Sequence, residues 1–121
     1  MTMTKKILLI IRAAPYAGIR AREALDVALL FSAFAPQIAV LFSGEGVWQL
    51  VDDQRPATLG AKSVEATLGA FAAYDITHVY ADAQALALRG LAAEPLLAGA
   101  QALNADALRK LLAAHDRVVT L

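Results

Sequence analysis

The chain has 121 residues, with eleven Lys and Arg against eleven Asp and Glu, two His and no Cys. This length supports one hydrophobic core, so we expect a single domain over residues 1–121. The formal net charge is zero and no basic run exceeds two residues, which argues against direct nucleic-acid binding. The lack of Cys excludes disulfides, thiolate metal sites and a cysteine nucleophile.

Hydrophobic residues make up 59% of the chain and charged residues only 18%. A monomer of this size has more surface than so few charges readily cover, so we expect part of the apolar excess to lie in a subunit interface. The uncharged run over residues 27–44 could suggest a membrane span, but Pro36 interrupts it where the pattern changes from helical to strand-like. The apolar run after Lys5 and Lys6 is too short for a signal peptide. The sequence predicts a cytoplasmic protein that does not enter a membrane.

Apolar runs typical of buried strands alternate with helical segments along the chain. The helix expected over 19–35 is apolar on all sides in its second half, which indicates burial on more than one side. Asp82 and Asn104 are expected to cap helices, and Gly90 to end one. The predicted elements are, in chain order, a strand over 5–12, a helix over 19–35, a strand over 37–43, a helical turn over 47–51, a helix over 62–74, a strand over 78–81, a helix over 82–90, a strand over 96–100, a helix over 105–114 and a strand over 117–121.

Alternating strands and helices with short links predict right-handed crossovers. We therefore expect an α/β fold, a three-layer sandwich around a mostly parallel sheet of about five strands.

The glycines Gly44 and Gly46 follow the second expected strand, where open α/β sheets usually place their sites. Position 49 is Gln where a dinucleotide fingerprint would need Gly, so a plain turn is the favoured interpretation. His78, at a strand start, and His115, at a helix end, are interpreted as structural. We find no complete active site, no metal site and no reason to expect a cofactor.

Several segments occur in one order along the chain and together resemble the DsrE/DsrF-like family. They include Ala-Pro-Tyr after the first strand and Leu-Arg-Gly-Leu after the third, and the resemblance covers essentially the whole chain. The matching segments are residues 14–16, 22–26, 46–50, 54–56, 74–76, 88–91 and 105–109. The fold that this resemblance implies is DsrE-like, with a flavodoxin-like topology.

The resemblance implies a sulfur relay, in which persulfide sulfur passes between cysteines toward 2-thiolation of the tRNA wobble uridine. The family's relay subunits assemble as a heterohexamer of three related chains, each present twice. The implied partners are two small subunits, TusB-like and TusD-like, with a TusE-like sulfur acceptor docking on the complex.

In the sulfur-carrying subunit of the family, the acceptor Cys follows the third strand at a helix N-terminus, a setting that favours thiolate. The matching position here is Asp82, and a carboxylate cannot hold a persulfide. The resemblance therefore implies a non-catalytic, structural subunit. The residues that we expect at subunit interfaces are Leu30, Phe31, Phe34, Val47, Trp48 and Leu50.

Two alternatives remain open at this point. The chain could be the equivalent subunit of a dissimilatory sulfur-oxidation complex, because its residues do not separate the two pathways. It could also be a free-standing α/β small-molecule-binding domain or enzyme that uses a crevice at Gly44–Gly46.

Overall fold

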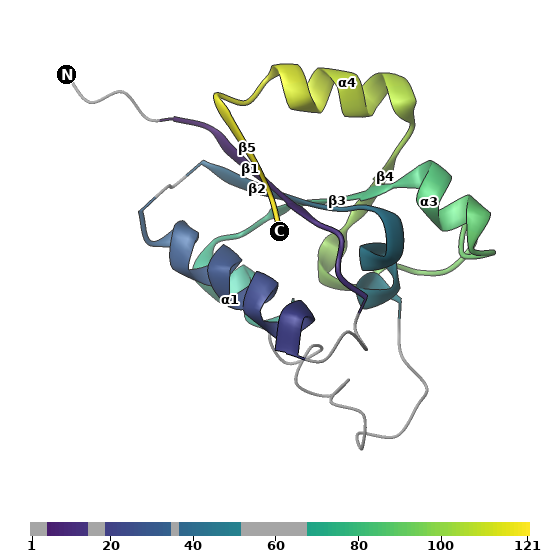
Figure 1. The fold of residues 1–121 in the computed structure, drawn as a ribbon, viewed down its shortest axis with the longest axis horizontal. Coiled ribbons are helices and arrows are strands. Elements are labelled where there is room, and N and C mark those ends of the chain that lie inside the picture. The colour runs from purple at the N-terminus through teal and green to yellow at the C-terminus, as the bar shows by residue number, and fades with distance from the viewer. Residues whose placement is uncertain (1–4, 15–18, 35–36, 52–67) are drawn as a thin grey trace.

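Five parallel strands form one sheet at the centre of the molecule (Figure 1). The computed structural model describes residues 5–14, 19–34, 37–51 and 68–121. The strands lie in the order β4-β3-β2-β1-β5. Their bounds are Ile7–Ile11 for β1, Ile38–Phe42 for β2, His78–Asp82 for β3, Gln101–Leu103 for β4 and Arg117–Thr120 for β5.

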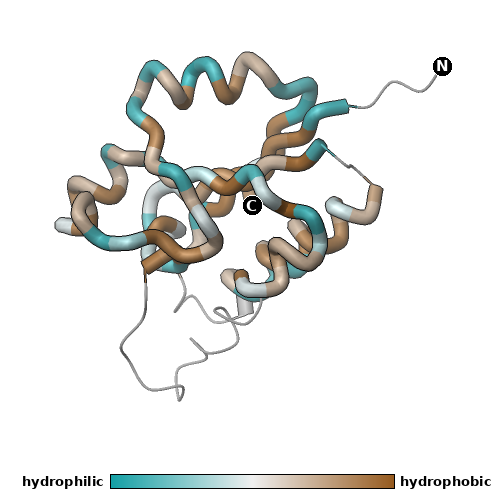
Figure 2. The backbone as a smooth tube through the Cα atoms, turned by 180° about the vertical axis from the view of Figure 1, so that it is seen from behind, coloured by the Kyte–Doolittle hydropathy of each residue, from teal (hydrophilic) through white to brown (hydrophobic). Residues whose placement is uncertain are grey.

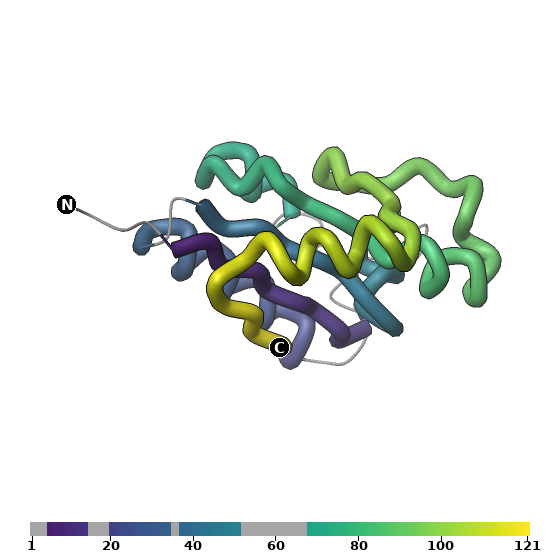
Figure 3. Tube along the Cα trace, turned by 90° about the horizontal axis from the view of Figure 1, so that it is seen from above, coloured from purple at the N-terminus to yellow at the C-terminus, as the bar shows by residue number. Residues whose placement is uncertain are grey.

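Helices cover both faces of this sheet. Helix α1 lies on one face and α4 on the other, and Figure 3 shows α4 running across the strands (Figures 1 and 3). The α-helices are α1 (Ile19–Ser32), α3 (Ala83–Leu88) and α4 (Ala105–Ala113), and the 3₁₀ helices are η1 (Gly44–Leu50), η3 (Ala72–Tyr74) and η4 (Leu97–Gly99). The predicted three-layer α/β class with a parallel five-stranded sheet is confirmed.

The strand order corrects the flavodoxin-like topology that we expected. In flavodoxin the order is 2-1-3-4-5, so the first strand lies between the second and the third. Here β1 lies between β2 and β5, and β2, β3 and β4 follow outward in chain order. The chain adds β2, β3 and β4 on one side of β1 and then returns to add β5 on the other side, so the topological switch point lies between β1 and β5.

The sequence placed the fourth strand over residues 96–100, and this was wrong. That segment contains η4, in which Ala98 and Gly99 have φ values of 59° and 67°. Left-handed residues cannot continue an extended strand, so pairing with β3 begins only at Gln101. Leu96 instead forms an isolated antiparallel bridge with Val51.

Other predicted elements end earlier than expected or are described only in part. The first helix ends at Ser32 and is followed by a turn. The first part of the helix expected over 62–74, residues 62–67, lies outside the described residues. Its described end consists of one helical turn at 68–69 and η3, which is closed by Asp75 in the left-handed conformation. No helix in the described part of the chain is long and apolar enough to cross a membrane.

We call the two sides of the sheet the α1 face and the α4 face. Parallel pairing in register places Leu9 beside Val40 and Val40 beside Val79, and all three point into the large core under α1. The α4 face carries a much smaller buried cluster of Leu8, Ala39 and Leu41. Every residue of β2 is buried, as expected for a strand covered on both faces.

Candidate functional site

The carboxyl ends of β1, β2 and β3 meet at one edge of the sheet, where open α/β proteins usually bind their ligands. Arg12 follows β1, Ser43 follows β2 and Asp82 ends β3. Gly44–Gly46 and Asp82, the two features that the sequence singled out, both lie at this carboxyl edge.

The two glycines of η1 serve tight packing of the backbone. Gly44 has a φ of 55°, which a glycine adopts without strain. A Cβ added to Gly46 would lie 2.2 Å from the carbonyl oxygen of Ile11. That carbonyl also accepts a hydrogen bond from the Ser43 amide at 3.0 Å. Both glycines are therefore explained by the turn and by its close contact with the end of β1.

Gln49 is a buried polar residue at this edge whose structural role the sequence did not reveal. Its side chain is 2% exposed, and Nε2 donates to the Ala13 carbonyl at 2.6 Å. This bond ties η1 to the segment after β1, across a separation of 36 residues. In the sequence, Gln49 was informative only as a family match and as a departure from the dinucleotide fingerprint.

Asp82 has the capping role that the sequence predicted. Its Oδ1 accepts hydrogen bonds from the backbone amides of Gln84, at 3.0 Å, and Ala85, at 3.5 Å. These amides are among those that a helix N-terminus leaves without partners. The carboxylate thus stabilises the start of α3, at the position where the family resemblance places an acceptor Cys.

An ion pair connects η1 to the far end of α3. Arg89 Nη2 lies 2.9 Å from Glu45 Oε1, and Arg89 Nη1 donates to the Ala85 carbonyl at 3.0 Å. The charged residues are 44 positions apart, so no local pattern could have indicated the pair. Together with Gln49, it holds the carboxyl edge as a framework of backbone and side-chain contacts.

The interface candidates fall into two groups. Leu30 and Phe34, near the end of α1, are 61% and 78% exposed. Val47 and Leu50 are fully buried in the chain's own core, while Phe31 and Trp48 are partly buried and pack against that core. Of the six, Leu30 and Phe34 therefore present the most apolar surface to a partner.

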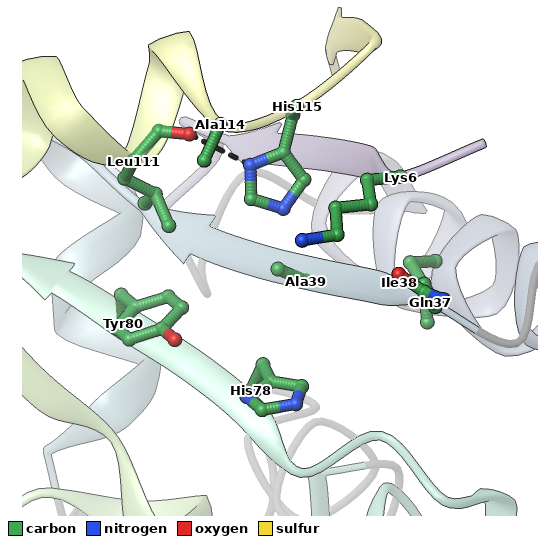
Figure 4. Close-up of a pocket in the computed structure, with 9 residues that line it drawn as sticks. All are labelled: Lys6, Gln37, Ile38, Ala39, His78, Tyr80, Leu111, Ala114 and His115. Atoms are coloured by element: carbon green, nitrogen blue, oxygen red, sulfur yellow. Dashed lines mark hydrogen bonds between the residues drawn. The ribbon is translucent and has the colours of Figure 1, made fainter.

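The structure also brings together two histidines that lie far apart in the sequence and that we interpreted individually as structural. His78 and His115 line one hollow of about 340 Å³ at the opposite, amino edge of the sheet, together with Lys6 and Tyr80 (Figure 4). No group of three or more His, Cys, Asp or Glu side chains within the described ranges is arranged to hold a metal ion.

The DsrE/DsrF-like family matches residues 5–121, and the chain belongs to this family. The family, the parallel sheet and the capped helix after β3 agree with the resemblance found in the sequence.

Among curated proteins, the chain is similar to a protein named TusC homolog from Pseudomonas aeruginosa, with 40% identity over 98% of this chain and 100% of the relative. It is also 36% identical to Protein TusC of Klebsiella pneumoniae, over 95% of this chain and 98% of that one. The crystal structure of the ychN protein from E. coli superposes with a TM-score of 0.80, covering 97% of this chain and 99% of the other at 18% identity. The last comparison supports the fold alone.

Proposed function

We propose that this chain is a non-catalytic, structural subunit of a sulfur-relay complex, which passes persulfide sulfur toward 2-thiolation of the tRNA wobble uridine. The observation that carries the proposal is the residue after β3. This chain, a member of the DsrE/DsrF-like family, has Asp82 there, and the Asp82 carboxylate accepts hydrogen bonds from backbone amides of α3. Its sequence contains no Cys. Sulfur carried as a persulfide needs a thiolate, so it must reside on another subunit.

The proposed partners are the two related small subunits, TusB-like and TusD-like, in a heterohexamer, with a TusE-like acceptor docking on it. The similarity to proteins named TusC over nearly their whole length supports this assignment. The cytoplasmic location and the absence of a cofactor remain predictions of the same proposal.

The proposed partner contact is the exposed apolar end of α1. Leu30 lies in the last turn of α1 and Phe34 in the turn that follows it, and both are exposed. Large exposed apolar side chains of this kind commonly become the anchors of an interface when a partner excludes water from them. In Figure 2 hydrophilic colours are interspersed along both helices, but the part of α1 from Val27 to Ser32, which leads to this contact, contains no charged residue.

Native mass spectrometry of the chain alone, and co-expressed with the two related subunits, tests the proposal. We expect an assembly of six chains with two copies of each. A stable homo-oligomer that binds neither subunit would overturn it, and would favour the alternative of a free-standing ligand-binding domain.

Phe34→Ser tests the proposed contact at the end of α1. Loss of an anchor side chain commonly costs about 2 kcal/mol of binding, so the variant should assemble markedly less while its fold is retained. Leu88→Ser is a matched control, since Leu88 is 77% exposed on α3. Trp48→Ala is expected to weaken assembly too, but it also removes packing against the core.

The dissimilatory alternative places the same subunit in a different pathway. Deleting the gene and measuring 2-thiouridine in bulk tRNA separates the two. Loss of the modified nucleoside supports the tRNA pathway, and unchanged levels support sulfur oxidation.

A further inference from the structure

The hollow at the amino edge exists because small residues face each other there. Its floor is Ala39 of β2, which is paired in register with Leu8 on one side and His78 on the other. Leu111 and Ala114, at the end of α4, lie above it (Figure 4). With alanine both below and above, the space is large enough for a small molecule, at about 340 Å³.

Most polar side chains around this hollow can donate hydrogen bonds. Lys6 brings a positive charge, Tyr80 a hydroxyl and Gln37 an amide, and none of the nine lining residues is acidic. Figure 4 shows the Lys6 amine pointing into the space between His115 and Ala39. Asp116 is the nearby carboxylate, and its Oδ2 accepts the backbone amide of Lys6 at 2.8 Å.

His115 is oriented by a hydrogen bond within its own helix end. Its Nδ1 lies 2.7 Å from the Leu111 carbonyl oxygen, which can only accept, so Nδ1 carries the proton. The other ring nitrogen is then turned toward Lys6 (Figure 4). His78 faces the same hollow from β3, on the far side of Ala39.

From this arrangement we infer that the hollow is a binding site for a small molecule bearing an oxyanion group of the phosphate or sulfate type. Lys6, Tyr80 and His78 would contact the oxyanion, and the apolar floor and roof would hold the rest of the ligand. The site is separate from the carboxyl edge. His78 and Asp82 are the two ends of β3, which a strand places about 13 Å apart. The inference therefore does not depend on the sulfur-relay proposal.

The test is a titration of the ¹⁵N-labelled full-length chain with sodium phosphate, and separately with sodium sulfate, at fixed pH. Sodium chloride keeps the ionic strength constant, so that general screening does not change. We expect saturable shifts of the amide signals of Lys6, Ala39, His78 and His115. Shifts that are diffuse, or that do not saturate with either anion, would overturn the inference.

Two variants and one control separate a built site from general charge attraction. Lys6→Met should weaken phosphate binding by about tenfold, the equivalent of about 1.4 kcal/mol. Ala114→Leu keeps every charge, but the larger side chain would occupy part of the hollow that Ala114 lines. Position 114 is exposed, and the variant should weaken phosphate binding to a similar degree. Lys5→Met removes a neighbouring exposed charge that does not line the hollow, and should leave the affinity unchanged. Equal losses in Lys5→Met and Lys6→Met would overturn the inference.

Discussion

The two faces of the sheet are built from the same strands but covered to very different extents. On the α1 face, side chains from β1, β2 and β3 join α1, η1 and α3 in a core that contains fully buried Leu25, Phe42 and Phe71. On the α4 face, only Leu108 and Leu111 of α4 pack against Leu8, Ala39 and Leu41. Val118 of the edge strand β5 is 44% exposed on that side.

This contrast indicates that the two faces contribute differently to the stability of the fold. The α1 face supplies most of the buried apolar area, and therefore most of the stabilisation of the fold. The α4 face is thinly covered, which leaves room for the hollow beside His78 and His115. Substitutions on the two faces and at the carboxyl edge test this difference, and their expected effects range from about 4 to about 1 kcal/mol.

Phe42→Ala should be the most damaging substitution. Phe42 is fully buried on the α1 face, and removing such a ring loses its transfer free energy and leaves a cavity. We expect a loss of about 4 kcal/mol in the free energy of unfolding, measured by urea denaturation. A loss below about 1 kcal/mol would contradict the inference that the α1 face supplies most of the stabilisation of the fold.

Gly46→Ala should destabilise the chain by about 3 kcal/mol, because the new Cβ would collide with the backbone at Ile11. Gly69→Ala is the matched control, since a Cβ added there meets no atom within 4 Å. Thermal unfolding of both variants measures the difference. If they unfold at the same temperature, η1 does not pack against the end of β1 as described.

Leu111→Ala should cost about 1 to 2 kcal/mol, less than a fully buried Leu, because Leu111 is only partly buried on the α4 face. Urea denaturation gives the value, with Leu25→Ala on the α1 face as the comparison. Because Leu111 also lines the hollow, its truncation enlarges the site. A larger loss than that of Leu25→Ala would reverse the ranking of the two faces.

Asp82→Ala should cost about 1 kcal/mol, the usual loss when an N-cap side chain that accepts from the first amides of a helix is removed. Asp82→Asn keeps an oxygen that can accept from Gln84 and Ala85, so its stability should be close to that of the unmodified chain. In both variants we expect tRNA thiolation to continue. Loss of thiolation with assembly intact would assign Asp82 a chemical role and contradict the proposed function.

Features with a local cause could be read from the sequence. The uninterrupted apolar runs over Ile7–Ile11 and Ile38–Phe42 are typical of parallel strands buried on both faces, and both form such strands. Asp82 and Asn104 cap the helices that follow them, because a side-chain oxygen satisfies amides only two or three residues away. The lack of Cys, visible from composition alone, means that the given sequence offers no thiol to hold a persulfide.

The tertiary structure decided what depends on distant segments meeting. Hydrophobic pattern does not encode which strands become neighbours, so the order β4-β3-β2-β1-β5 and the place of β4 were not predicted correctly. The pairing of Arg89 with Glu45, and the convergence of Lys6, His78 and His115, join residues tens of positions apart. The sequence predicted the strands and caps because their causes are local, whereas the hollow exists only because the sheet and α4 pack with small residues facing each other.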